Sequence, residues 1–317
     1  MKTYLGRYNP TVVAAPRWRR METLLRDSLI ELGHEVVERE WDANGDRRGD
    51  SGFTILPHSS RRVRPDAHLF FKEMHLPGLF TVDVDGWGVE HSALQRDIDF
   101  EGVDADSAVP RLAALRERMV IGNLSRQPQP AAGDVPDSGY ILLALQMPAD
   151  SVVVDHSPIS MMALLDAVTG WAEARRQRVA VKLHPCSLNI ADLVEAVTRL
   201  TRGSRYVVEV RGNIHSLIAA ARGVFVINSS TGFEALLHGK PVATFGDCDY
   251  KRVTFAATAA TIDDAADWCD VYGAAEQLRA AQFVDWYCSR HGYPVLDDDI
   301  SATQQRLRGY LSEVVPR

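Results

Sequence analysis

The second half of the chain alternates short apolar runs with stretches whose apolar residues recur at helical spacing. Runs such as residues 140–146 (YILLALQ) and 178–183 (RVAVKL) are nearly continuous and do not alternate with polar residues. Strands with this pattern are buried on both faces, which requires helices on both sides of a parallel sheet. Three further strands are expected at residues 205–210, 224–228 and 241–245, with helices between them. We therefore predict a doubly wound α/β domain here.

The first half is less regular but contains the same two kinds of segment. A helix is expected over residues 16–32, and four short apolar runs that resemble strands follow it. Residues 125–138 (SRQPQPAAGDVPDS) are rich in Pro, Gly and Ser, as a linker between domains would be. The length of 317 residues is enough for two domains. We expect an N-terminal Rossmann-like domain over residues 1–130, a C-terminal one over 131–295, and a final helix within 296–317 that can pack back on the first domain.

The bulk properties of the chain limit its partners and its location. A formal net charge of −7 gives no overall attraction to polyanions, so a nucleic-acid partner is not expected. No apolar run approaches the roughly 18 residues of a membrane span, and the first residues lack the apolar stretch of a signal peptide. We expect a cytoplasmic protein, for which peripheral contact with a membrane remains open. The four cysteines are scattered without a paired Cys or His motif, which favours reduced thiols over a metal site.

Polar residues at the carboxyl ends of the predicted strands are candidates for a site, because ligands of open α/β sheets bind there. Lys182 and His184 leave the second strand of the C-terminal domain in the sequence KLHP. A cation and an imidazole suit a phosphate, or the negative charge that develops on a leaving group. A purely structural histidine is the alternative. Gln146 and Asp150 follow the first strand and are candidate contacts to a base, a ribose or an acceptor.

A second candidate is the sequence NSSTGFE, where a predicted strand runs through hydroxyl residues into a helix. Ser229, Ser230 and Thr231 stand at the expected helix start, and the free N–H groups of such a start attract anions. A capping box between Thr231 and Glu234 is the structural alternative. It does not require the two serines, so we favour a phosphate site.

A third candidate follows the apolar run at residues 79–84, in the sequence DVDGWG. Gly86 and Gly88 permit close approach of the backbone to a ligand, and Asp85 is a candidate base or nucleophile. One alternative is a DxD metal site formed with Asp83, which lacks any further ligand cluster and ranks lowest. The other alternative is a polar strand end with a glycine turn.

In this order the motifs resemble the capsule polysaccharide synthesis family, whose members include the β-Kdo transferases (Kdo is 3-deoxy-manno-octulosonic acid). The matching segments are LALQMPADSVV, HSP, VKLHP and INSSTGFEALLHGKPVATFGDCDY, all within residues 140–250. The wider group of GT-B sialyltransferases is similar in having an HP pair, a Ser-Ser/Thr pair and an acidic-Gly motif. The resemblance implies a GT-B-like fold, with two Rossmann-like doubly wound domains that face a cleft.

The resemblance also implies roles for individual residues. Asp85 corresponds to the catalytic aspartate of the acidic-Gly motif, although VDVDGWG departs from the expected flanking residues, and His184 is the second catalytic candidate. The residues expected to bind the nucleotide-sugar donor are Lys182, His184, Ser229, Ser230, Thr231, Glu234, Gln146, Asp150 and Tyr250.

The implied activity is transfer of Kdo or a related acidic sugar from a CMP donor to a glycan or glycolipid acceptor. A CMP donor leaves a single phosphate, whose charge Lys182, the serine pair and a helix N-terminus could stabilise without a metal. We therefore expect no metal and no other cofactor. The alternatives are a transferase that uses a UDP- or GDP-sugar, a nucleotide-sugar epimerase of the same architecture, and an inactive nucleotide-binding subunit. Retaining and inverting routes both stay open.

Overall fold

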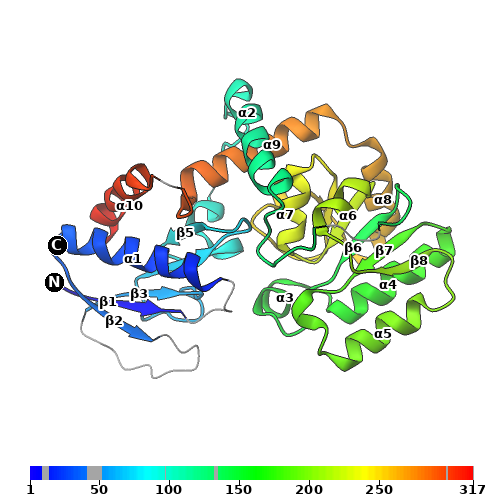
Figure 1. Cartoon of the computed structure of the whole chain (residues 1–317), viewed down its shortest axis with the longest axis horizontal. Coiled ribbons are helices and arrows are strands. Elements are labelled where there is room, and N and C mark those ends of the chain that lie inside the picture. The colour runs from blue at the N-terminus through cyan, green and yellow to red at the C-terminus, as the bar shows by residue number, and fades with distance from the viewer. Residues whose placement is uncertain (9–13, 41–51, 97, 132–134, 298, 317) are drawn as a thin grey trace. The chain divides into compact units, whose positions relative to one another are not determined.

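Two six-stranded sheets organise the chain, each in its own unit (Figure 1). Unit 1 consists of Met1–Asp99 and Trp286–Arg317, and unit 2 of Phe100–Asp285. The structure is a computed structural model that describes residues 1–8, 14–40, 52–96, 98–131, 135–297 and 299–316. No helix in these ranges is both long enough and apolar enough to cross a bilayer.

Unit 2 contains a sheet in which every described strand is parallel to its neighbours. The strands are β6 (Ile141–Ala144), β7 (Val179–Lys182), β8 (Val207–Val210), β9 (Gly223–Val226), β10 (Val242–Thr244) and β11 (Phe255–Ala256). From β8 to β11 their spatial order is 3-2-1-4-5-6 when counted along the chain, which is the Rossmann order. The direction of winding reverses between β6 and β9, and ligands of such sheets bind beyond the strand ends at this switch point.

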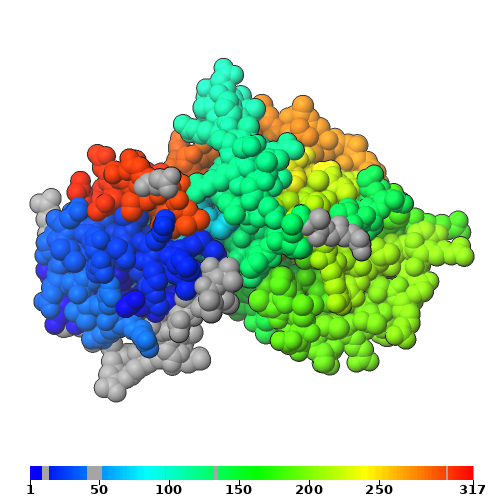
Figure 2. Space-filling view, in the orientation of Figure 1, coloured from blue at the N-terminus to red at the C-terminus, as the bar shows by residue number. Residues whose placement is uncertain are grey.

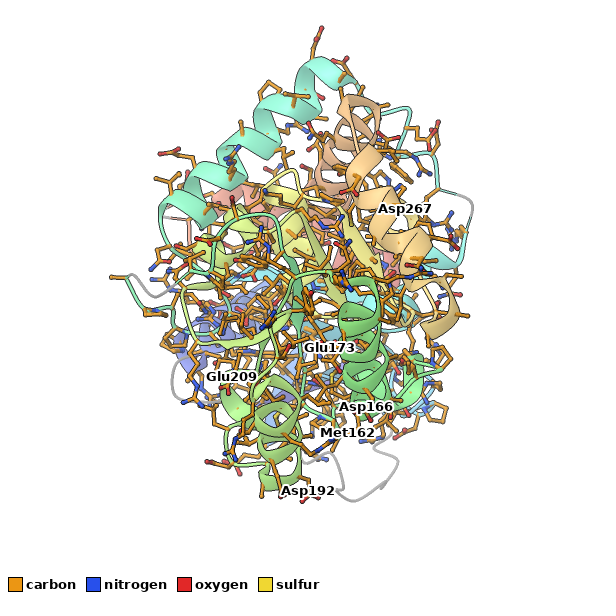
Figure 3. The ribbon with its side chains drawn as sticks, turned by 90° about the vertical axis from the view of Figure 1, so that its right-hand side faces the viewer. Met162, Asp166, Glu173, Asp192, Glu209 and Asp267 are labelled. Carbon is orange, nitrogen blue, oxygen red and sulfur yellow. The ribbon has the colours of Figure 1, made fainter. Side chains whose placement is uncertain are left out.

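Helices cover both faces of the sheet of unit 2, as the buried apolar strands require. The described helices of unit 2 are α2 (Ala105–Arg116), α3 (Ser151–His156), α4 (Met161–Arg175), α5 (Ala191–Thr201), α6 (Ile214–Ala220), α7 (Ser230–Leu237), α8 (Ile262–Val271) and α9 (Ala274–His291), whose last turns belong to unit 1. Helices α4, α5 and α8 share a core with β6, β7 and β9. Figure 3 shows Asp166, Glu173 and Asp192 on α4 and α5, where they are exposed and leave the apolar faces of both helices for this core.

Unit 1 has the strand order β12-β5-β4-β3-β1-β2. Its elements are β1 (Lys2–Arg7), α1 (Ala15–Glu31), β2 (Glu35–Glu40), β3 (Phe53–Pro57), β4 (Leu69–Glu73), β5 (Leu79–Asp83), β12 (Tyr293–Pro294) and α10 (Ser301–Val314). Strands β1 to β4 are parallel, whereas β5 is antiparallel to β4 and to β12. Helix α10 lies against α1, and both contribute buried residues to one core with the sheet, Leu25 and Leu311 among them.

The segment before the first strand of unit 2 belongs to that unit, so the division of the chain differs from the sequence-based boundaries at 130/131 and 295/296. Helix α2 contacts α7, and Figure 2 shows this turquoise-green segment against the yellow surface of unit 2. Asn213, before α6, donates from Nδ2 to Asn123 Oδ1 at 2.7 Å and to the Pro130 carbonyl at 2.6 Å. The Ile214 N–H donates to Gln129 Oε1 at 2.9 Å. We call residues 123–130 the strap, because polar contacts near both of its ends hold it on α6.

Candidate functional site

The switch point of unit 2 is held together by two buried amides. Gln146 follows β6 and donates from Nε2 to Asn228 Oδ1 at 2.9 Å, and its Oε1 accepts the N–H of Asn228 at 3.1 Å. Asn228 in turn donates from Nδ2 to the carbonyls of Val152 and Asp247. The donor-binding residue expected at Gln146 is therefore engaged with protein groups, and it fixes the loop that leads into Ser229.

Ser229 is the residue that caps α7. Its Oγ accepts the N–H of Thr231 at 3.2 Å, and the helix begins at Ser230. Thr231 therefore lies inside the first turn, and the capping box considered between Thr231 and Glu234 is wrong because the helix starts earlier. Glu234 therefore has no part in the cap. The start of α7, which carries the positive end of the helix dipole, lies at the switch point.

Tyr250 contacts the start of α7. Its ring is 0% exposed, and its hydroxyl donates to the Ser229 carbonyl. Burial raises the pKa of the phenol, so the hydroxyl keeps its proton and remains a donor. A Cβ at position 232 would lie 2.5 Å from the Tyr250 hydroxyl, so the close approach requires Gly232. Tyr250, which was expected to contact the nucleotide-sugar donor, is buried and hydrogen-bonds to the protein backbone.

Glu234 belongs to a cluster of titratable side chains that also includes Arg126, Lys182 and His184. It is 3% exposed, and burial raises the pKa of its carboxyl to about 7. A hydrogen bond from the Ser125 side chain and the charges of Arg126 and Lys182 pull that pKa down, but burial is the larger effect. Lys182, the last residue of β7, is half-buried, and burial lowers the pKa of its amine while Glu234 opposes this shift.

His184 stands at the edge of the same cluster. Burial is the main cause of its lowered pKa, the charges of Arg126 and Lys182 lower it further, and Asp150 opposes them. The His184 Nδ1 accepts the N–H of Cys186 at 3.1 Å. The neutral ring therefore carries its proton on Nε2, which can donate to a ligand. Asp150 also caps α3 by accepting the N–H of Val152 at 3.2 Å.

Arg126 is the member of the cluster that the sequence analysis did not identify. It lies on the strap, and its Nη1 donates to Ser230 Oγ at 3.3 Å in the first turn of α7. Its charge acts on both His184 and Glu234. A single arginine in a Pro-rich stretch has no pattern that distinguishes it from an arginine in a linker. The structure thus brings the expected donor residues to one end of the sheet of unit 2 and adds Arg126 to them, while Gln146 and Tyr250 hydrogen-bond to protein groups there.

Asp85 lies in unit 1, on the turn after β5. Asp83 pairs with Phe70 near the start of β4. The last residue of antiparallel β5 therefore lies near the amino ends of β3 and β4, away from their carboxyl ends. The strand-end rule that suggested Asp85 therefore does not apply to it. Its side chain is 43% exposed and forms an ion pair with Arg61 Nε at 3.0 Å. Arg61 also donates from its backbone N–H to the Asp85 carbonyl at 2.7 Å, so the two residues join neighbouring loops.

Asp83 shapes the turn that presents Asp85. Its Oδ1 accepts the N–H groups of Asp85, Gly86 and Ser92 at 2.9, 3.0 and 2.9 Å, and its Oδ2 accepts the Ser92 hydroxyl at 2.5 Å. Both carboxylate oxygens are thus used within the protein, which argues against the DxD metal site. Among the described residues, no group of three or more His, Cys, Asp or Glu is arranged to hold a metal ion.

Comparison with known proteins gives matches to one family and to solved structures. Residues 102–266 match the family described as "Capsule polysaccharide biosynthesis protein", and the match begins at the start of unit 2 and includes the strap. Protein FixF of Sinorhizobium fredii is 33% identical over 268 residues, which are 76% of this chain. The chain spans 58% of the length of FixF.

Two solved structures of Thermosulfurimonas dismutans KpsC have a similar fold. The β-Kdo 2,7 transferase is 16% identical with a TM-score of 0.52, and the match covers 89% of this chain and 90% of that one. The β-Kdo 2,4 transferase is 18% identical with a TM-score of 0.50, and covers 88% and 89%. The predicted fold class, an α/β chain with two Rossmann-like domains, is confirmed.

Proposed function

The chain belongs to the capsule polysaccharide biosynthesis family, and from this premise we propose that it is a glycosyltransferase that moves Kdo or a related acidic sugar from a CMP donor to a glycan or glycolipid acceptor. The observation that carries the proposal is the cluster at the switch point of unit 2. There Lys182 and His184 lie at the end of β7 and the start of α7 follows β9, and we propose that together they form one compact anion site. One phosphate fits such a site, and CMP-activated sugars carry one.

In the proposed reaction, the bond between the anomeric carbon and the phosphate oxygen breaks, and the electron pair stays on the phosphate of CMP. Lys182 supplies a positive charge, the first turn of α7 supplies the positive end of its dipole, and His184 supplies an Nε2–H donor. Ser229 and Ser230 add hydroxyl groups at the same place. These groups stabilise the developing charge without a metal ion, so we propose metal-independent transfer.

Asp85 is proposed as the catalytic carboxylate of unit 1. Its side chain is accessible, and the Asp83 carboxylate holds the turn that carries it. In an inverting route, Asp85 takes the proton of the acceptor hydroxyl as that oxygen bonds to the anomeric carbon. In a retaining route, Asp85 first bonds to this carbon as CMP leaves; the acceptor hydroxyl then displaces the Asp85 carboxylate and loses its proton to water. Product stereochemistry distinguishes the two routes.

The test is a transfer assay with CMP-Kdo as the donor and a panel of Kdo-terminated and neutral glycolipid acceptors. We expect CMP release to rise with acceptor concentration, and the acceptor to gain the mass of one sugar. A Ser229→Ala, Ser230→Ala double variant should release CMP more slowly, while Ser160→Ala, which changes only the cap of α4, should match the wild type. Donor conversion that no acceptor accelerates would favour the epimerase alternative and would contradict transfer.

A further inference from the structure

We infer that Arg126 is a ligand of the donor phosphate and that Asn213 positions it through the strap. The inference rests on the proposed function, because it assumes that the start of α7 binds that phosphate. Its ligand class is a nucleotide phosphate ester.

Arg126 lies beside the start of α7. Its guanidinium meets the first turn of α7 at Ser230 Oγ, 3.3 Å from Nη1, and Ser125 beside it hydrogen-bonds to Glu234. The side chain is half-buried, so a ligand at the helix start can reach it. The guanidinium therefore lies at the helix start that follows β9, and its charge acts on Glu234 together with that of Lys182, the last residue of β7.

The arginine side chain suits a phosphate by its shape and charge. Arg126 Nη1 lies 3.3 Å from the Ser230 hydroxyl at the helix start. A phosphate at that place offers two charged oxygens, and the planar fork of arginine can donate to both at once. Such charge-assisted hydrogen bonds are stronger than those between neutral groups.

Asn213 fixes both ends of the strap. Asn213 is 3% exposed, and its Oδ1 caps α6 by accepting the N–H groups of His215 and Ser216 at 2.8 and 3.2 Å. Its Nδ2 donates to Asn123 Oδ1 and to the Pro130 carbonyl, the two ends of the strap. One side chain therefore has separate atoms for the helix cap and for the strap, with Arg126 between the two anchored ends.

Because the strap and the helix cap use different atoms of Asn213, one substitution can release the strap and keep the cap. Asp is as good a helix cap as Asn, so Asn213→Asp keeps the cap of α6. It removes the Nδ2 donor and places a carboxylate oxygen against two acceptor oxygens, which releases the strap. Asn123→Gly is a second variant with the same aim: Asn123 has a left-handed φ of 54°, which glycine tolerates, and the change removes the acceptor of Asn213.

The experiment is calorimetric titration of CMP into the full chain. Arg126→Gln should weaken binding about 10-fold to 100-fold, the range for charge-assisted hydrogen bonds, and Arg126→Lys should fall between it and the wild type because lysine lacks the fork. Arg211→Gln is the matched control and should bind like the wild type, since Arg211 is an exposed residue that pairs with Glu209. Thermal unfolding of each variant shows whether it is folded.

A double-mutant cycle tests the role of Asn213. Asn213→Asp, or Asn123→Gly, should weaken CMP binding in the wild-type background and have no further effect when Arg126→Gln is already present. Unchanged affinity in folded Arg126→Gln would overturn the ligand role. An equal loss in both backgrounds would show that Asn213 acts independently of Arg126. If the wild type binds neither CMP nor UDP nor inorganic phosphate, the donor site and this inference both fail, which is a different result from affinity that survives Arg126→Gln.

Discussion

Replacing Glu234 with glutamine should change how the free energy of unfolding depends on pH. Burial raises the pKa of this carboxyl from its ordinary value of 4.5 to about 7 in the folded chain. The folded chain therefore holds the proton in a pH range where the unfolded chain has lost it. The stability that this carboxyl contributes is fully present below pH 4.5 and is lost as the pH rises through about 7. Glutamine has no such proton, so Glu234→Gln should be spared this decrease.

The size of the effect follows from the size of the shift. One pKa unit corresponds to about 1.4 kcal/mol, so ionising Glu234 in its buried place is unfavourable by about 3 kcal/mol. Between about pH 5 and about pH 8, the unfolding free energy of the wild type should therefore fall by about 2 to 3 kcal/mol relative to Glu234→Gln. Urea unfolding of the nucleotide-free chains at several pH values measures this difference. Glu195→Gln, an exposed carboxyl on α5, is the control and should follow the wild type.

Two results would refute this reasoning. Parallel curves for the wild type and Glu234→Gln would mean that the carboxyl does not titrate in this range. A variant that loses stability relative to the wild type as the pH rises would mean that Lys182 and Arg126 outweigh burial and keep Glu234 charged.

Two further predictions concern single residues of the two units. Asp85→Asn should lower turnover on the order of 10²-fold or more while CMP affinity persists, since a catalytic carboxylate acts on the chemical step. The control is Asp66→Asn, which breaks an ion pair with Arg64 in the same unit. Normal turnover in folded Asp85→Asn would exclude a catalytic role for Asp85. Gly232→Ala should lower the melting temperature and weaken CMP binding, because the added carbon meets Tyr250 and such overpacking is unfavourable by about 1 to 3 kcal/mol. Wild-type stability in that variant, measured by thermal unfolding, would show that the helix start is not tightly supported.

The sheet of unit 2 could be predicted because its strands are buried on both faces. Apolar runs such as Ile141–Ala144 and Val179–Lys182 predict buried strands. The polar residues at or after the ends of these strands carry the charge of the candidate site. This rule selects Lys182 and His184 as candidates, and the sequence NSSTGFE at a predicted helix start selects Ser229. Their grouping follows from the Rossmann order of the strands.

The strap could not be predicted from composition. Its Pro, Gln and Ser residues resemble those of a linker, and its contacts join residues far apart in the chain, such as Asn123 and Asn213. Long-range contacts of this kind leave no local periodicity. Arg126 was therefore missed together with the segment that carries it.

The direction of β5 could have been predicted from its loop. Only five residues, 74–78, separate β4 from β5, and the Met74 N–H donates to the Leu79 carbonyl at 2.8 Å. So short a connection permits an antiparallel pair and excludes a parallel crossover. The sequence LPG, with Gly78 at a φ of 75°, was the signal for this hairpin.

The donor is the central claim, and thermal unfolding with nucleotides tests it most directly. Binding to the folded state at about 100 times the dissociation constant adds roughly 2.7 kcal/mol of stability, which gives a measurable rise in melting temperature. We predict that CMP raises the melting temperature of the chain more than UDP, GDP or ADP does, and that the rise persists in the presence of a chelator. A larger rise with UDP or GDP, or a rise that requires Mg²⁺ or Mn²⁺, would contradict the assignment of a CMP-activated acidic sugar.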